Sequence, residues 1–268
     1  MEGLSDRQRS EIEYHQDFAA QRSHLKDVPF SLDVCESVER RWWNSYWSLY
    51  DVLATHPLKG KRVLVPGCGF GEDCARLSFF GADVVGIDLS PEIIEITQHR
   101  LVKFAKNATA AAMPCERLDF PDDYFDEVVL VNILHHVDIA KTMKEVRRVT
   151  KPGGIVAGLE MYTHSAVQKL RNNAVTEKII YPLVKKVIYS GKDPYITPDE
   201  RKVDQLEMRQ IVSDLTDVKL DYFNILVGRI FSDSGVRISK FDRRLCKAMG
   251  GLSSILAGRV IFEGRKPS

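Results

Sequence analysis

The sequence predicts an α/β protein built on a doubly wound, mostly parallel sheet with helices on both faces. From residue 59 onward, short apolar segments alternate with helical patterns, as strands and crossover helices do in such folds. The segment 126–134 is apolar without alternation, which is typical of a strand covered on both sides. Capping residues mark the helix starts: Ser90 and Pro91, for example, stand where an N-cap and a first helical residue are expected.

The elements follow one another in a regular order after residue 59. Seven segments have the composition of strands: 61–66, 82–90, 108–114, 126–134, 154–162, 218–226 and 258–266. Five segments between or after them have the apolar spacing of amphipathic helices: 71–81, 91–107, 139–150, 204–215 and 241–256. We therefore expect one main domain whose strands and helices alternate along the chain.

Two regions depart from this alternation. The first 58 residues carry helical patterns without a strand signal, and five large side chains there share one expected helix face: Trp43, Tyr46, Trp47, Tyr50 and Leu53. Helical patterns also interrupt the alternation at about 163–210. We predict a helical N-terminal extension or lid over 1–58, and a domain over 59–268 with a helical insertion at about 163–210.

Composition excludes several classes of protein. A formal net charge of +1 provides no broad attraction for nucleic acid. No apolar run approaches the roughly 18 residues that span a bilayer, and the first residues lack the apolar stretch of a signal peptide. The five cysteines form no C-x-x-C pair and have no metal-ligand spacing, so we expect reduced thiols, no metal and a cytoplasmic protein. These cysteines are Cys35, Cys68, Cys74, Cys115 and Cys246.

The segment "VLVPGCGFGED", residues 63–73, carries the strongest chemical signal. A buried strand here breaks into Gly67, Gly69 and Gly71 and then enters a helix, an arrangement in which backbone amides approach a ligand closely. The dinucleotide pattern G-x-G-x-x-G would need a glycine at 72, where the chain has Glu72. An acidic residue there would repel a pyrophosphate, which argues against a nicotinamide oxidoreductase and for a ligand without phosphates.

Asp88 completes this interpretation. It ends the second expected strand about 20 residues after the glycines, the spacing at which a carboxylate accepts hydrogen bonds from ribose hydroxyls. A turn residue at the entry of the next helix is the alternative explanation for a lone aspartate. With the glycine turn beside it, ribose binding is favoured, and a nucleoside without phosphates fits both features.

At this point the sequence resembles the class I S-adenosylmethionine-dependent methyltransferases. The matching stretches are "VLVPGCGFGED", "VVGIDLSPEII", "CERLDFPDDYFDEVVLVNILHHV" and "EVRRVTKPGGIVAGLE". The last two are similar to small-molecule methyltransferases of ubiquinone and menaquinone biosynthesis. The resemblance implies a Rossmann-like, seven-stranded sheet whose last strand is antiparallel, and S-adenosyl-L-methionine as the cofactor.

The resemblance also implies roles for individual residues. The backbone at Gly67, Cys68 and Gly69 would approach the methionine part of the cofactor, and Tyr14 in the extension would cap the same end. Asp88 would hold the ribose and Leu89 would contact the adenine. The remaining implied contacts are Cys115 and Glu116 at the adenine, and Asn132 and Ile133 at the methionine and sulfonium.

Two positions depart from the family pattern. The first strand usually carries an acidic residue where this chain has Val65, and the turn at the adenine usually has one where it has Pro114. Either the loss of these acidic residues weakens cofactor affinity, or neighbouring carboxylates such as Glu72 and Glu116 compensate for it.

Methyl transfer from a sulfonium is an in-line displacement, so the enzyme's main work is alignment, and a base is needed only if the acceptor must lose a proton. The candidates for such a base are His15, His136 and Glu160, and the sequence does not decide between them. Aromatic residues in the extension and the insertion predict a small, largely apolar metabolite, such as a natural product, a quinone or a lipid.

Other functions stay open from the sequence. The basic stretch 183–192 is compatible with an ordinary surface helix or with peripheral membrane contact. A methyltransferase acting on a macromolecule, and a non-catalytic cofactor-binding protein of the same fold, are the alternatives, and the oligomeric state is not predicted.

Overall fold

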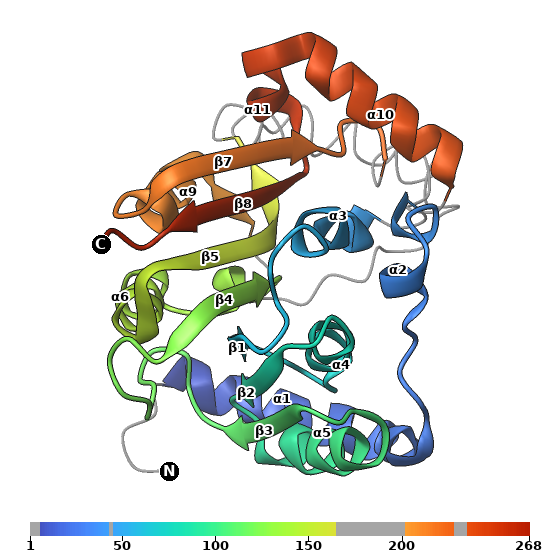
Figure 1. Cartoon of the computed structure of the whole chain (residues 1–268), viewed down its shortest axis with the longest axis vertical. Helices are drawn as coiled ribbons and strands as arrows, with labels where there is room; N and C mark the ends of the chain where they lie inside the picture. Colours follow the sequence, from blue (N-terminus) through green and yellow to red (C-terminus); the bar gives the residue numbers. More distant parts are fainter. Residues whose placement is uncertain (1–5, 43–44, 165–201, 228–234) are drawn as a thin grey trace.

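The structure is a computed structural model that describes residues 6–42, 45–164, 202–227 and 235–268 (Figure 1). The greater part of the expected insertion, including the basic stretch 183–192, lies outside the described residues. Within the described ranges, no helix is long and apolar enough to cross a bilayer.

The strands form one mixed sheet in the order β3-β2-β1-β4-β5-β8-β7, and a two-residue strand, β6, pairs with β5 off this path. All the pairings along it are parallel except those of β8, which runs antiparallel to both neighbours. The predicted α/β fold and its antiparallel last strand are therefore confirmed. The strands are β1 (Arg62–Pro66), β2 (Asp83–Asp88), β3 (Ala108–Ala112), β4 (Phe125–Val131), β5 (Thr150–Thr163), β6 (Val203–Asp204), β7 (Thr216–Phe223) and β8 (Arg259–Arg265).

Helices cover both faces of the sheet because its central strands are apolar on both sides. Val63 and Val65 of β1 pack into a core shared with α3, α4 and α5, whereas Leu64 points into the opposite core with α6 and α9. The helices of this domain are α4 (Glu72–Phe79), α5 (Pro91–Phe104), α6 (Ile139–Val149), α9 (Gln205–Val212), α10 (Val236–Met249) and α11 (Ser253–Leu256).

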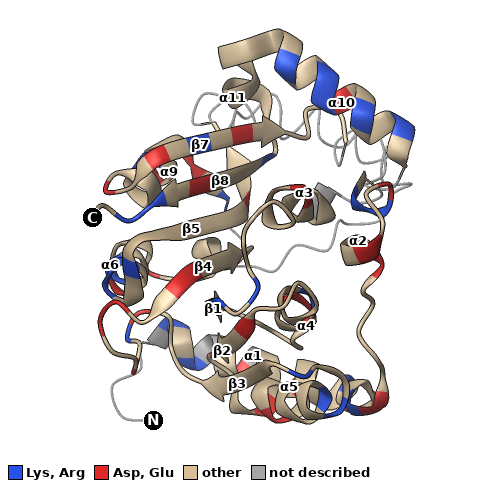
Figure 2. Ribbon diagram, in the orientation of Figure 1, with Lys and Arg blue, Asp and Glu red and all other residues tan. Residues whose placement is uncertain are grey.

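Charged residues of both signs are spread over the elements, with one local concentration (Figure 2). Lys and Arg follow one another along α10, whose sequence VRISKFDRRLCKAM contains five basic residues and one acidic residue. The acidic residue, Asp242, is buried and accepts hydrogen bonds from the backbone amides of Ile225 and Leu226, at 3.2 and 2.7 Å. Asp242 therefore fixes the chain just after β7. It does not balance the positive charge on the surface of α10.

The N-terminal extension is helical in its described part, but its helices are short. Helix α1 (Asp6–Gln21) packs along α5 and is followed by a 3-10 turn at Ser23–Asp27 and by α2 (Asp33–Glu36) (Figure 1). The prediction of a single helix with one aromatic face near residues 43–53 is wrong. Two 3-10 turns, Arg40–Trp42 and Ser45–Ser48, precede the five-residue α3 (Leu49–Leu53).

A buried arginine explains this break. The guanidinium of Arg41 donates to the carbonyl oxygens of Val34 and Cys35, at 2.7 and 3.2 Å, and so bends the chain back toward α2. Tyr50 and Leu53 are nevertheless buried, as their spacing predicts. Trp43 and the side chain of Tyr46 lie outside the described residues.

Candidate functional site

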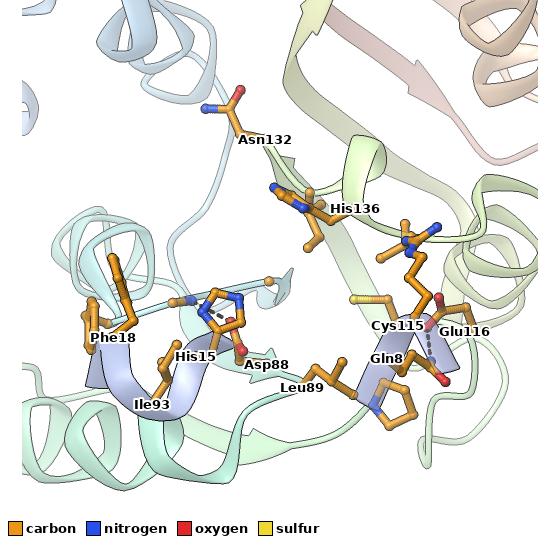
Figure 3. Close-up of a pocket in the computed structure, with 17 residues that line it drawn as sticks. Gln8, His15, Phe18, Asp88, Leu89, Ile93, Cys115, Glu116, Asn132 and His136 are labelled. Atoms are coloured by element: carbon orange, nitrogen blue, oxygen red, sulfur yellow. Dashed lines mark hydrogen bonds between the residues drawn. The ribbon is translucent and has the colours of Figure 1, made fainter. Parts of the chain in front are cut away.

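A cavity of about 230 Å³ lies where β1, β2 and β4 end, and residues of α1 form part of its wall (Figure 3). The elements meet there because parallel strands present their carboxyl ends at one edge of the sheet. The cavity brings together eight residues that the sequence analysis singles out for a cofactor: Gly67, Gly69, Asp88, Leu89, Cys115, Glu116, Asn132 and Ile133.

Gly67 and Gly69 lack a side chain for different physical reasons. Gly67 has φ +68°, and a Cβ there would meet Ile133 Cδ1 at 2.5 Å, so close packing excludes a side chain. Gly69 has φ +50°, and a Cβ there would meet no heavy atom within 4 Å. Because Gly69 also lines the cavity, its missing side chain leaves room for a ligand to approach the backbone.

Asp88 is held by the backbone at the base of this turn. Its two carboxylate oxygens accept from the amides of Gly69 and Ser90, each at 3.1 Å. Thr97 donates to the carbonyl oxygen of Gly69 at 2.6 Å, which fixes the turn from the other side. Burial raises the pKa of Asp88, while the bonds from Ser90 and Gly69 and the nearby His15 oppose that rise. The carboxylate is thus fixed, partly exposed and directed at the cavity (Figure 3).

The turn after β3 places a second acidic residue at the cavity. Glu116 accepts from Gln8 Nε2 of α1 at 3.0 Å and from the amide of Asp138 at 3.2 Å (Figure 3). Burial raises the pKa of the neighbouring Cys115 thiol far above its usual range, so this thiol stays protonated. Pro114 also lines the cavity without a charge, and Glu116 is therefore the carboxylate of this turn.

The loop after β4 is shaped by Glu160, one of the three candidate bases. Glu160 is fully buried on β5 and accepts from the amides of Ile133 and Leu134, at 2.8 and 2.7 Å. Its other oxygen lies 2.8 Å from Nδ1 of His135, which is also buried. Glu160 does not line the cavity, because these bonds turn its carboxylate toward the loop backbone.

The two candidate histidines do line the cavity. His15 enters from α1 beside Asp88, and His136 enters from the 3-10 turn Leu134–His136 after β4 (Figure 3). Phe18, one turn beyond His15, stacks on Phe70 of the glycine turn with ring centroids 5.7 Å apart. Tyr14 belongs to α1, but its side chain lies outside the described residues.

Asn132 links this loop to the antiparallel strand. It adopts φ +49° at the end of β4, and its Oδ1 accepts from Arg259 of β8 at 3.2 Å. An asparagine tolerates this left-handed backbone better than most residues do.

Sequence reasoning missed a second hollow on the glycine turn. It is lined by Gly67, Gly69 and Phe70, which it shares with the cavity, and by Trp47, Cys68, Glu72, Asp73, Arg76 and Val131. Cys68, expected at the cofactor's methionine end, lines this hollow instead of the cavity. In the sequence, the only sign of this hollow was the spacing of Asp73 and Arg76, three residues apart on α4. Trp47 is brought beside them only by the fold.

The cysteines and possible metal ligands give no further site. All five cysteines are free and buried. Cys68 and Cys74 share a hydrogen bond that, with burial, raises the pKa of Cys68. In the part of the chain that the structure describes, no three His, Cys, Asp or Glu side chains are grouped to hold a metal ion.

Comparisons with known proteins agree with this geometry. A family model described as a methyltransferase domain matches residues 64–158. Demethylmenaquinone methyltransferase from Clavibacter sepedonicus is 30% identical over 155 residues, which cover 56% of this chain and 61% of that protein. The chain thus spans about three-fifths of the length of this curated relative.

Solved structures share the fold at lower identity. The YcgJ protein from Bacillus subtilis has a TM-score of 0.55 at 19% identity, covering 82% of this chain and 98% of that one. Geranyl diphosphate C-methyltransferase from Streptomyces coelicolor A3(2), in complex with S-adenosyl-L-homocysteine, has a TM-score of 0.54 at 12% identity, covering 83% and 78%. The matched residues 64–158 contain the glycine turn, Asp88 and the loop after β4. Residues 64–158 therefore match a methyltransferase domain, and the chain shares its fold with these solved structures.

Proposed function

We propose that this protein transfers a methyl group from S-adenosylmethionine to an oxygen, nitrogen or carbon atom of a small, largely apolar metabolite, such as a quinone, a lipid or another natural product. One observation carries the proposal: the open position at Gly69 stands beside the fixed carboxylate of Asp88. A carboxylate facing a glycine turn suits a nucleoside whose ribose hydroxyls donate hydrogen bonds.

The residues around the cavity fit this cofactor. Asp88 would accept from the ribose, Leu89 and Cys115 would contact the adenine with Glu116 at its edge, and Asn132 and Ile133 would face the methionine and sulfonium. The bound cofactor supplies an already activated methyl group. The protein's own contribution is then to align the acceptor and to exclude water.

Helix α1 is suited to the role of a lid. Gln8 bonds Glu116 at 3.0 Å, Gln16 bonds Glu92 at 3.2 Å, and Phe18 stacks on Phe70. The two hydrogen bonds join exposed or half-buried side chains, so they can break without leaving a buried charge. We infer that residues 1–58 form a lid over the domain 59–268, and that ligands enter when α1 moves.

Apolar side chains form a large part of the cavity wall, beside titratable groups that include His15 and His136. Phe18, Ile133 and Val137 line the cavity together with His136. This lining supports a largely apolar acceptor, as does the substrate in the name of the Clavibacter relative, a demethylmenaquinone. His15 and His136 are the groups that we propose as candidate bases if the acceptor must lose a proton, because both line the cavity and Glu160 does not.

Calorimetry followed by a transfer assay tests the proposal. We expect S-adenosylhomocysteine to bind the full chain, and quinols or phenols supplied with S-adenosylmethionine to gain one methyl group by mass spectrometry. No binding at millimolar ligand would overturn the proposal. Binding without transfer to any acceptor would indicate a non-catalytic protein, and methyl incorporation only into added RNA or protein would indicate a macromolecular substrate.

A further inference from the structure

The second hollow bears on the departure at Val65. Val65 is the penultimate residue of β1 and is 1% exposed within the core, so no carboxylate stands at this position of the strand. The hollow adjoins the cavity, because Gly67, Gly69 and Phe70 line both. A ligand lying across the glycine turn would therefore meet the side chains of the hollow at one end.

Asp73 and Arg76 form a fixed pair of opposite charges in that hollow. Arg76 Nη1 donates to Asp73 Oδ1 at 3.2 Å, and the hydroxyl of Tyr50 donates to the same oxygen. The side chains of Asp73 and Arg76 are 12% and 6% exposed. Arg76 Nε also donates to the carbonyl oxygen of Ser31 at 3.2 Å. The extension thus holds both charged groups in place from the side opposite the turn.

The carboxylate of Glu72, the residue before Asp73, binds a different partner. Glu72 Oε1 accepts from Arg100 at 2.7 Å, and the same Arg100 nitrogen donates to the carbonyl oxygen of Phe70 at 2.8 Å. Glu72 therefore serves to fix the turn. Glu72 also lines the hollow, but its Oε1 atom is already bound by Arg100.

We propose that Asp73 and Arg76 form a zwitterion subsite for the amino-acid end of the cofactor. Asp73 accepts hydrogen bonds from the α-ammonium group, and the guanidinium of Arg76 faces the α-carboxylate. A pair of opposite charges, already desolvated and held by neighbours, matches the paired charges of an amino acid better than a single acid does. This inference rests on the proposed function, because it places the methionine end of that cofactor.

A comparison of two ligands isolates this subsite. S-adenosylhomocysteine contains the amino-acid end, whereas 5′-methylthioadenosine keeps the nucleoside and the sulfur but lacks that end. We expect Asp73→Asn to weaken S-adenosylhomocysteine by about 10- to 100-fold, the loss of charge-assisted bonds, and to leave 5′-methylthioadenosine within about threefold of wild type. Calorimetry measures both affinities.

Two matched variants sharpen the result. Glu72→Gln removes the adjacent carboxylate and should change the two affinities equally or not at all, because Glu72 acts through the turn. Asp88→Asn should weaken both ligands alike, because both carry the ribose. If Asp73→Asn fails to fold, Asp73→Glu keeps the charge but moves it by one methylene, and it should weaken S-adenosylhomocysteine selectively.

The outcomes separate the two proposals. Equal losses for both ligands in the Asp73 variant, or no loss for either, would overturn the zwitterion subsite while leaving the cofactor in place. Failure of the wild-type protein to bind either ligand would overturn the proposed function itself.

Discussion

The ends of β2 and β5 each carry an acidic residue at the carboxyl edge of one sheet, yet the two residues differ in their surroundings. Glu160 is closed off by two backbone amides and by His135, with no face toward the cavity. Asp88 receives two backbone amides but remains partly exposed at the cavity. The same chemical group thus becomes structural in one place and available to a ligand in the other. The difference lies in exposure, because Glu160 is fully buried whereas Asp88 keeps part of its surface at the cavity.

Removing Glu160 should have the largest effect, and it should be an effect on stability. Glu160→Ala leaves two buried amides without an acceptor and His135 without its carboxylate. We expect a loss of about 3–5 kcal/mol in the free energy of unfolding, measured with urea. Glu160→Gln keeps one oxygen acceptor and should lose less. A loss below about 1 kcal/mol for the alanine variant would contradict the closed role of Glu160.

Removing Asp88 should instead affect binding. Asp88→Ala should weaken S-adenosylhomocysteine by about 1.5–3 kcal/mol, the value of bonds to a charged group. Its folded-state pKa is raised, so ionisation of Asp88 costs stability as the pH rises from the unfolded pKa through the folded pKa. At neutral pH we therefore expect the alanine variant to lose little unfolding free energy. A stability loss as large as that of the Glu160 variant would remove the contrast between the two carboxylates.

The glycine turn provides a smaller version of the same comparison. Both Gly67→Ala and Gly69→Ala impose backbone strain of about 1–2 kcal/mol, because both glycines have positive φ. Gly67→Ala also forces a Cβ against Ile133 and should therefore be the less stable of the two in urea. Gly69→Ala projects into open space and should show the larger loss of ligand affinity relative to its stability loss. If Gly67→Ala instead showed the larger loss of affinity relative to its stability loss, the ligand would not lie against Gly69.

The smallest effect should come from a histidine and two carboxylates that are paired at the opposite edge of the sheet. It should appear as a change in the free energy of unfolding with pH. His56 lies 2.8 Å from Glu127 and 3.4 Å from Glu263. Burial alone would lower the pKa of His56, but the two carboxylates raise it above its ordinary value. Stabilisation is therefore complete below the unfolded pKa of histidine and is lost as the pH rises through the folded pKa. Urea unfolding between pH 5 and 9, roughly the range around the histidine pKa, should show this decline.

A matched variant and the cofactor affinity complete the pH test. His56→Gln should remove the decline in stability, because glutamine does not titrate. The affinity for S-adenosylhomocysteine should be equal in the variant and the wild type at each pH, since His56 does not line the cavity. A decline that persists in His56→Gln would assign the pH dependence to another group.

Local patterns predicted a large part of the fold and of the site. Both-faces-apolar segments and the caps around them indicated the parallel strands and their helices, because these signals act within a few residues of the chain. The three glycines and Asp88 were also recognisable, since a strand–turn–helix unit and the end of the next strand bring them together by the rules of parallel sheets. Gly67, Gly69 and Asp88 do converge on one cavity, whereas Gly71 does not line it.

The predictions that were wrong depended on contacts between distant segments. The expected aromatic helix breaks because Arg41 bonds carbonyls six and seven residues earlier, a choice that spacing does not reveal. Glu160 was a reasonable base by position, but its bonds to Ile133 and Leu134 come from another strand's loop. Sequence position alone could not tell which acceptor positions would be filled.

By itself, the sequence determined the strand–helix alternation and the convergence of Gly67, Gly69 and Asp88, because each follows from residues close together in the chain or from fixed spacings. Only the tertiary structure decided which carboxylates stand beside the glycine turn and which donors reach them. Tyr50 of the extension and Arg76 of α4 hold Asp73 beside the glycine turn, and Arg100 links Glu72 to the carbonyl oxygen of Phe70 in the same turn. The reason is physical: a carboxylate's role depends on which donors reach it, and donors from distant segments are brought to it only by folding.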